Sequence, residues 1–219
     1  MQTGEAVTIV HGEQELFERT RHLFTTATDV ACAANGLATW AAAQSAPEFT
    51  GMVRERRPAG ARLRKMYRSA LLLDQVAARN LARDRDRHGA HVRVTTQEIN
   101  ETIILDRRLV ILAGDLTAGR RSYTVITQRE AVQAVTSLFD AAWHSATELD
   151  VYDTQIAEIR HLAPQVLDLL SQGAKDEAAA RTLGLGVRTY RRRVAELMDA
   201  LGAESRFQAG VRARELGLV

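Results

Sequence analysis

The chain has 219 residues, of which 46% are hydrophobic and 26% are charged, as in an ordinary globular protein large enough to bury a core. Cys32 is the only cysteine, which excludes an internal disulfide and a cysteine-based metal cluster within one chain and favours a reduced, cytoplasmic compartment. No window reaches the ~18 apolar residues of a membrane span, and the N-terminus lacks a signal-peptide pattern, so we expect a soluble protein with no membrane partner.

The net charge of +2 is distributed unevenly along the chain. Residues 160–219 carry 10 basic and 7 acidic side chains, a balance of +3, whereas residues 1–159 carry 19 and 20, a balance of −1. Only two of the 29 basic residues are lysines. An arginine bias suits a GC-rich genome as well as it suits phosphate recognition, so the positions of the arginines must decide between these explanations.

The first two thirds of the sequence alternate between strand and helix patterns. Short apolar or alternating runs predict strands, and apolar residues spaced three or four apart predict helices. We expect strands at 6–10, 30–34, 61–67, 91–95, 102–106, 109–113 and 122–127, and helices at 13–27, from about 47, at 75–87 after an N-cap at Asp74, and at 129–148. The order βαβαβαββββα predicts an α/β layer architecture for residues 1–150.

The last part of the chain is purely helical in pattern. After a partly helical linker at 151–160, we expect four short helices at 163–173, 175–184, 187–202 and 205–217, each closed by a glycine, as helix C-termini prefer. Ser205 is a good N-cap for the last helix. Only Leu185 and Gly186 separate the second and third helices, which is roughly the tight turn of a helix-turn-helix.

Three motifs occur in a fixed order in this region: Leu183-Gly184 at the turn, Thr189 in the third helix, and Ser205-Arg206-x-Gln208-Ala209 at the start of the fourth. In order and spacing they resemble the LuxR-type helix-turn-helix of bacterial transcription regulators. The sequence departs from that pattern in Ala178-Ala179-Ala180, where Glu-Ile-Ala is usual, and in Gly186, where a serine N-cap is frequent. The resemblance implies a small all-α four-helix DNA-binding domain at residues 161–219.

The third helix carries Arg188, Arg191, Arg192 and Arg193 and has no acidic residue before Glu196. Its apolar residues follow the i, i+3, i+4, i+7 pattern of a buried stripe: Val194, Leu197, Met198 and Leu201. At about 100° per residue, all four arginines can be displayed without burying a charge. A solvated cationic face is the alternative interpretation, although acidic residues normally intersperse on such a face.

The resemblance assigns roles to the residues around this helix. We expect Arg191 and Arg192 to contact base edges in the major groove, and Arg188, Thr189, Arg193 and Lys175 to contact phosphates. Tyr190 fits packing and DNA contact equally well.

The segment INETIILDRRLVILAGDLTAG, residues 99–119, forms a strand pair followed by a loop of small residues. It resembles the strand pair that carries the His-x-Lys-x4-Asp motif in the phospholipase D superfamily. Asp106 matches the aspartate, but Ile99 and Glu101 occupy the places of the histidine and the lysine. Because isoleucine cannot attack phosphorus and glutamate would repel the phosphate, we expect no catalytic residues and no enzyme activity. The resemblance implies a degenerate phospholipase D-like domain for sensing or dimerisation.

A degenerate catalytic cleft could bind a ligand at the ends of the predicted strands. The candidate residues for such a pocket are Asn35, Trp40, Tyr67, Asn100, Glu101 and Asp106. The alternative for each of them is a packed or hydrogen-bonded framework role. We expect no metal site and no cofactor, because the histidines are scattered and no phosphate-binding loop is present.

The sequence therefore predicts a cytoplasmic transcription regulator that binds double-stranded DNA. We expect a homodimer, with apolar contacts from Val211 and Leu216, and a small-molecule effector is a candidate partner. Two alternatives remain. One is a phospholipase D-like phosphodiesterase or nuclease with an appended DNA-binding module, and the other is a scaffold whose helical tail contacts a protein partner.

Overall fold

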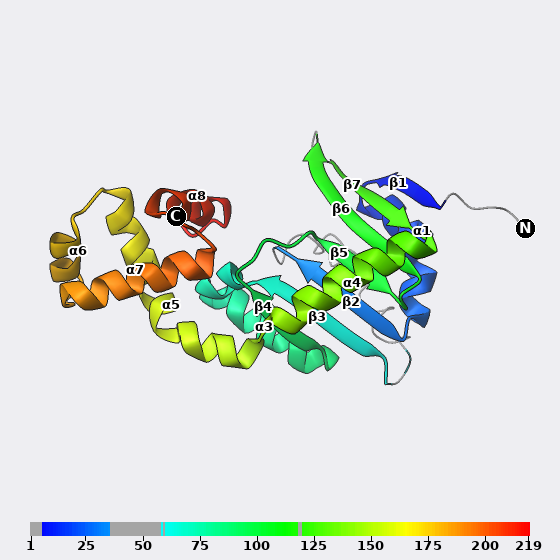
Figure 1. Cartoon of the computed structure of the whole chain (residues 1–219), viewed down its shortest axis with the longest axis horizontal. Helices are drawn as coiled ribbons and strands as arrows, with labels where there is room; N and C mark the ends of the chain where they lie inside the picture. The colour runs from blue at the N-terminus through cyan, green and yellow to red at the C-terminus, as the bar shows by residue number, and fades with distance from the viewer. Residues whose placement is uncertain (1–5, 36–57, 59, 118–119) are drawn as a thin grey trace, which may run out of the picture. The chain divides into compact units, whose positions relative to one another are not determined.

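The computed structural model describes residues 6–35, 58, 60–117 and 120–219, which form a mixed α/β protein (Figure 1). The elements of the α/β part are β1 (Val7–His11), α1 (Glu13–Thr26), β2 (Asp29–Ala34), β3 (Arg62–Arg68), η2 (Ser69–Leu73), α3 (Gln75–His88), β4 (His91–Thr95), β5 (Thr102–Leu105), β6 (Leu109–Thr117), β7 (Arg120–Ile126) and α4 (Arg129–Ser145). They are followed by β8 (Thr147–Glu148), α5 (Leu149–Ser171), α6 (Asp176–Thr182), α7 (Val187–Leu201) and α8 (Arg206–Glu215). None of the described helices is long and apolar enough to cross a membrane.

The chain divides into two compact units that interleave in sequence. The first comprises residues 1–67, 84–93 and 99–146, and the second comprises residues 68–83, 94–98 and 147–219. The second unit therefore contains two segments from the middle of the chain in addition to the C-terminal helices, which differs from the sequence-based division into 1–150 and 161–219.

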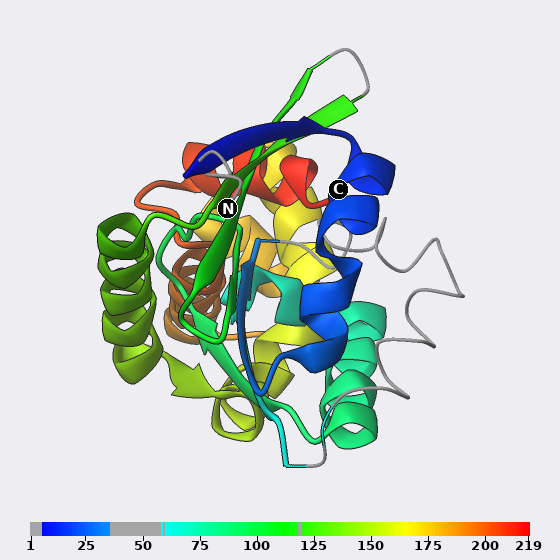
Figure 2. The same cartoon turned by 90° about the vertical axis from the view of Figure 1, so that its right-hand side faces the viewer.

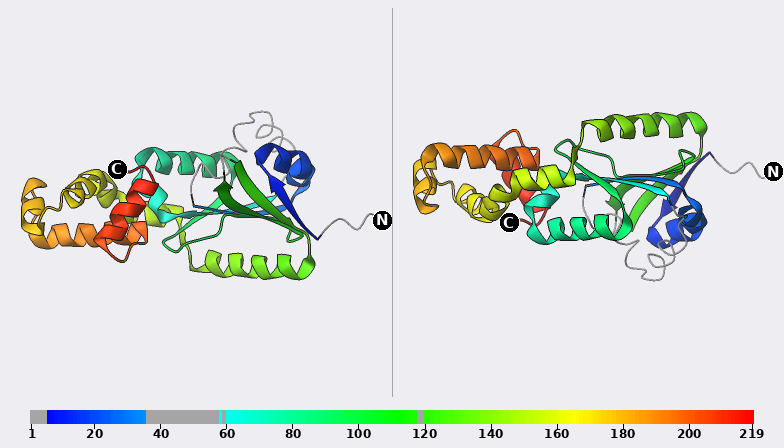
Figure 3. Two further views of the ribbon diagram at one scale, coloured as in Figure 1. Left: turned by 90° about the horizontal axis from the view of Figure 1, so that it is seen from above. Right: turned by 90° about the horizontal axis from the view of Figure 1, so that it is seen from below.

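The first unit is built on a mixed sheet with the strand order β1-β7-β6-β5-β2-β3-β4. β2 runs parallel to β3, with Ala34 beside Tyr67, and antiparallel to β5, with Val30 beside Leu105. β5, β6, β7 and β1 are joined by antiparallel pairing. Figure 2 and Figure 3 show α1 and α4 on opposite faces of this sheet, so both faces of its central strands are covered.

The main core of the first unit lies between the sheet and α4. Small residues of β2 make room there for large residues of α4, since Ala31 and Ala33 lie in the same buried cluster as Phe139 and Trp143. The cationic Arg64 of β3 is 3% exposed beside these two rings, and its guanidinium carbon is 5.3 Å from the centre of Phe139. Burial of this charge is tolerated because Arg64 donates a 2.7 Å hydrogen bond to Asp140.

Within the described residues, the strands and helices expected in the first two thirds of the chain are present within a few residues of their predicted bounds. Asp74 caps the N-terminus of α3, as predicted, because its carboxylate accepts a 2.6 Å hydrogen bond from the amide of Ala77. The helix expected from about residue 47 lies outside the described residues. α4 ends at Ser145 rather than near Glu148, and β8 follows it.

The linker at 151–160, expected to be partly helical, is helical throughout and continuous with the next predicted helix. α5 runs without interruption from Leu149 to Ser171 and includes Pro164. The cause is a continuous buried stripe at three- and four-residue spacing, formed by Leu149, Tyr152, Ile156, Ile159, Ala163, Val166 and Leu167.

The remaining helices of the second unit have the expected turns. The four predicted closing glycines all have left-handed backbone, with φ between 64° and 69°: Gly173, Gly184, Gly202 and Gly217. Ser205 caps α8, since its hydroxyl accepts a hydrogen bond of 3.2 Å from the amide of Gln208.

Candidate functional site

α7 has one deeply buried face. Val194, Leu197 and Leu201 of the predicted stripe are 0–3% exposed, and Met198 is half-buried. The stripe begins one turn earlier than expected, because Tyr190 is also completely buried. Burial raises the pKa of the Tyr190 phenol, whose oxygen has no hydrogen-bond partner among the described residues. Tyr190 therefore packs in the helical unit and does not face outward for contact with a ligand.

The opposite face of α7 is cationic in its first half. Arg188, Arg191 and Arg192 are exposed, while Thr189 is half-buried. Lys175, the residue before α6, is exposed as well. The predicted site residues thus separate into an outward group on α7 and Lys175 near the start of α6.

Acidic residues of α6 contact one of these arginines. The Nε atom of Arg191 donates a 2.7 Å hydrogen bond to Asp176, and its Nη2 atom lies 3.6 Å from Glu177. The second carboxylate oxygen of Asp176 lies 2.8 Å from Arg206 at the start of α8. The hydrogen bond from Arg191 is the main reason that the pKa of Asp176 is lowered, and the same contact raises the pKa of Arg191.

Arg193 departs from the expected outward display. Its side chain is 13% exposed and forms ion pairs with Glu158 of α5 and with Glu196 of α7. Arg192, by contrast, is 63% exposed, with its Nε atom 3.6 Å from Glu196. The two neighbours differ because position 193 lies at the edge of the buried stripe and faces α5. Arg193 therefore connects two helices and is not displayed with the other three.

The residues predicted to line a ligand pocket separate toward opposite ends of the sheet strands. At one end, the amide of Asn35 donates a 3.1 Å hydrogen bond to Glu101, and its side-chain amide donates one of 2.9 Å to the carbonyl of Ile99. Glu101 also forms an ion pair with Arg121 of β7. Tyr67 is buried near the end of β3, and Asn100 is exposed beside Glu101. Trp40 lies outside the described residues.

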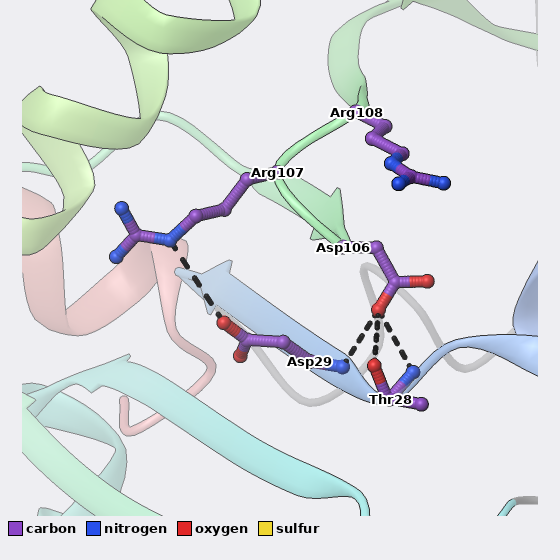
Figure 4. A pocket seen from close by; sticks show the side chains of 5 residues that line it. All are labelled: Thr28, Asp29, Asp106, Arg107 and Arg108. Carbon is purple, nitrogen blue, oxygen red and sulfur yellow. Dashed lines mark hydrogen bonds and ion pairs between the residues drawn. The ribbon is translucent and has the colours of Figure 1, made fainter.

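Asp106 lies at the other end of β5, in the turn to β6. One of its oxygens accepts three hydrogen bonds of 2.8–2.9 Å, from the amide and hydroxyl of Thr28 and from the amide of Asp29 (Figure 4). Asp106 and Arg107 have positive φ values of 49° and 55° and form the centre of the tight turn. The position of Asp106 at this end of β5 explains why it does not join Asn35 and Glu101 in one pocket.

A shallow pocket of about 290 Å³ surrounds this turn, lined by Thr28, Asp29, Asp106, Arg107 and Arg108. In Figure 4 the side chain of Arg107 points toward Asp29, while that of Arg108 points to the other side of the turn. Arg107 also lies 2.7 Å from Asp140, so its charge is partly neutralised. Among the described residues, no three histidine, cysteine or acidic side chains are grouped to bind a metal ion.

Sequence reasoning missed the acidic residues that contact α7. Asp176 and Glu177 open the second predicted helix, where acidic residues are common because they stabilise a helix N-terminus. Their contact with Arg191 requires the fold, since 15 positions separate Asp176 from Arg191. The helix-turn-helix pattern could have placed α6 beside α7, but it could not have shown that the carboxylate of Asp176 contacts the guanidinium of Arg191.

No protein-family model matches the chain. Over 132 residues it is 34% identical to the "Bialaphos biosynthetic pathway regulatory protein" of Streptomyces hygroscopicus, in a match that covers 60% of this chain and 52% of that protein. The chain thus spans about half the length of this curated relative.

Three solved structures are similar to this chain. TrmBL2, an archaeal chromatin protein, has a TM-score of 0.47 and 18% identity, over 68% of this chain and 56% of that one. Nuc from Salmonella typhimurium, a phospholipase D family member, has a TM-score of 0.46 and 10% identity, in a match that covers 65% of this chain and 96% of that one. NucT from Helicobacter pylori has a TM-score of 0.45 and 10% identity, over 65% and 99%.

Proposed function

We propose that this protein is a DNA-binding transcription regulator of the LuxR type, in which α6 and α7 form the helix-turn-helix and α7 is the recognition helix. The observation that carries the proposal is the outward display of Arg188, Arg191 and Arg192 from the first half of α7, opposite a face that is almost completely buried. A helix that lies in the major groove contacts bases mainly through residues of its N-terminal half. The name of the similar Streptomyces protein, a pathway regulator, agrees with this role.

For the α/β unit we propose a phospholipase D-like half that has lost catalysis and serves as a sensor or dimerisation domain. Ile99 packs against the core. Glu101 accepts a hydrogen bond from the backbone amide of Asn35 and forms an ion pair with Arg121. Neither residue supplies a nucleophile or a cation for a phosphate. We therefore propose that the protein is not an enzyme and acts in the cytoplasm, with an unidentified small-molecule effector as a candidate ligand.

For the oligomeric state we propose a homodimer formed through α8. The side chain of Phe207 is 83% exposed, and Val211, one turn further on, is 43% exposed. Leu216, also expected at this contact, is exposed just after α8. Two copies joined here would present two recognition helices to the two halves of a palindromic site.

The experiment is a measurement of DNA affinity against salt concentration, with the full chain and duplexes selected from a random pool. We expect log K to fall linearly with log salt, because each phosphate contact releases counterions. In the double variant Arg188→Ala/Arg192→Ala we expect a weaker affinity and a slope that is smaller by about two. A matched control is Arg79→Ala/Arg83→Ala, which removes two exposed arginines of α3. Equal losses in the two double variants would contradict the assignment of α7.

A further inference from the structure

We propose that Asp176 orients Arg191 to recognise a guanine, which makes Arg191 the specificity-determining residue of α7 and Asp176 its positioning residue. The inference rests on the function proposed above and concerns the division of labour within the arginine cluster. Sequence reasoning assigned base contacts to Arg191 and Arg192 alike. The contacts in the structure distinguish between them.

The first step is the geometry of the guanidinium of Arg191. Its Nε atom is bound to Asp176 at 2.7 Å, yet the side chain is 60% exposed. Nε is occupied, and Nη2 lies 3.6 Å from Glu177, beyond hydrogen-bond distance, so the two terminal Nη groups provide the fork that remains for a ligand. Such a fork matches the O6 and N7 acceptors of guanine in the major groove.

The second step is the rigidity of the carboxylate. The side chain of Asp176 is only 14% exposed, and its two oxygens contact different arginines: one accepts a hydrogen bond from Arg191, and the other forms an ion pair with Arg206. A carboxylate bound on both sides has little freedom to rotate. Arg191 is therefore oriented before any DNA arrives, and less rotamer freedom is lost when it binds a base.

The third step is the contrast with the neighbouring arginines. Within the described part of the chain, Arg188 has no ion pair or hydrogen bond, and Arg192 approaches Glu196 only at 3.6 Å. Both side chains remain free to follow a phosphate, which accepts hydrogen bonds over a wide range of directions. They suit contacts with the DNA backbone, which position a protein but carry no sequence information.

The test compares the sequence preferences of full-length variants. Wild type and each variant select duplexes from a random library, and affinities are then measured on the preferred duplex and on derivatives in which each G·C pair is replaced in turn. Arg191→Lys keeps the charge but removes the fork, and Asp176→Asn removes the charge that orients it. Arg206→Gln is the matched control, because it removes the other partner of Asp176 and leaves the contact with Arg191 in place.

We expect wild type to prefer one particular G·C pair by roughly ten- to a hundred-fold, the range of a good bidentate contact. Arg191→Lys should lose that preference while its affinity for unrelated duplexes stays the same. Asp176→Asn should lose preference several-fold at the same pair, while its affinity for unrelated duplexes stays the same or rises, since one negative charge is removed. Arg206→Gln should lose less of the preference than Asp176→Asn, because it frees one side of the carboxylate but leaves its bond to Arg191 in place.

Two results would overturn the inference. One is an unchanged preference in Arg191→Lys, a variant whose exposed side chain keeps the test valid even if Asp176→Asn fails to fold. The other is the same loss in Arg206→Gln as in Asp176→Asn, which would show that Asp176 acts through α8. A wild-type chain with no salt-dependent DNA affinity would instead refute the proposed function, so the two failures are distinguishable.

Discussion

The hydroxyl of Ser69 donates a 2.9 Å hydrogen bond to the carbonyl oxygen of Ala200. Ser69 follows directly after β3, and Ala200 lies in the last turn of α7, where carbonyl groups have no partner within the helix. Arg212 of α8 contacts the next carbonyl, that of Leu201, at 2.9 Å. The C-terminal end of the proposed recognition helix is thus bound by side chains from two distant parts of the chain.

The contact of Ser69 leads to a stability prediction. Ser69→Ala should leave the carbonyl of Ala200 buried without this partner, and we expect the free energy of unfolding to fall by about 1–2 kcal/mol. The measurement is urea denaturation at neutral pH. Ser171→Ala is the matched control, because the hydroxyl of Ser171 bonds only to the carbonyl of Asp168 at an exposed position. We expect Ser171→Ala to change the free energy of unfolding by at most about 0.5 kcal/mol. Equal losses in the two variants would show that the hydrogen bond of Ser69 contributes no more to stability than an exposed one.

Asp140 pairs with two arginines of very different burial, which gives a second prediction. Arg64 and Arg107 each lie 2.7 Å from this carboxylate, but their side chains are 4% and 56% exposed. Replacing Arg64 by Met should lower the free energy of unfolding by about 3 kcal/mol, because a partly buried acid loses its main partner and two aromatic rings lose a cation. Arg107→Ala should cost about 1 kcal/mol or less. The same denaturation experiment measures both, and a larger loss for Arg107→Ala would contradict this account.

Acid should destabilise the protein through Asp106. Burial opposes ionisation of Asp106, but hydrogen bonds from Asp29 and Thr28 outweigh it and lower the pKa below its ordinary value of 3.8. A pKa that is lower in the folded state adds stability above 3.8, and this stability is lost as pH falls through the folded value. Asp106→Asn keeps an acceptor oxygen for the three bonds and removes the titration. The free energy of unfolding, measured from pH 6 to pH 2.5, should therefore fall less steeply in Asp106→Asn than in wild type, whereas parallel curves would count against this role.

Much of the fold could be predicted because its local signals are strong. Alternating or continuous apolar runs marked β4, β5, β6 and β7, and the four glycines marked the ends of the last helices. The sequence could not give the order of strands in the sheet, because pairing such as that of β2 with both β3 and β5 joins distant segments. The full length of α5 was not predicted, although its buried stripe continues from Leu149 to Leu167.

The candidate site could be predicted in outline but not in its electrostatics. The stripe on α7 oriented Arg188, Arg191 and Arg192 correctly, since helical periodicity depends on one element alone. Asp176, which binds Arg191, and Glu158, one of the two partners of Arg193, lie on other helices, 15 and 35 positions away, and no local pattern reveals them. The residues expected to line one ligand pocket do not lie together, because Asp106 and Glu101 are at opposite ends of β5.

We expect loss of Arg193 to lower the stability of the fold, and loss of Arg188 to lower the DNA affinity. Arg193→Ala removes ion pairs with Glu158 and Glu196, and we expect a loss of about 1 kcal/mol in the free energy of unfolding. Its DNA affinity at a temperature where it is fully folded should match wild type. Arg188→Ala should show the reverse, with unchanged stability and a salt slope reduced by about one. A reduced salt slope in folded Arg193→Ala would place Arg193 on the DNA after all.

We expect the protein to have no phosphodiesterase activity. Hydrolysis in a phospholipase D-like site needs a nucleophile and a cation at the positions of Ile99 and Glu101, and Glu101 instead forms an ion pair with Arg121. Asp106, the residue that does match the motif, lies in a turn and accepts hydrogen bonds from the backbone amides of Thr28 and Asp29. Incubation of the full chain with bis(p-nitrophenyl) phosphate, and separately with duplex DNA, should release no product above buffer, and Asp106→Ala should behave identically. Turnover by wild type that disappears in Asp106→Ala would establish an enzyme with a DNA-binding module and displace the regulator proposed here.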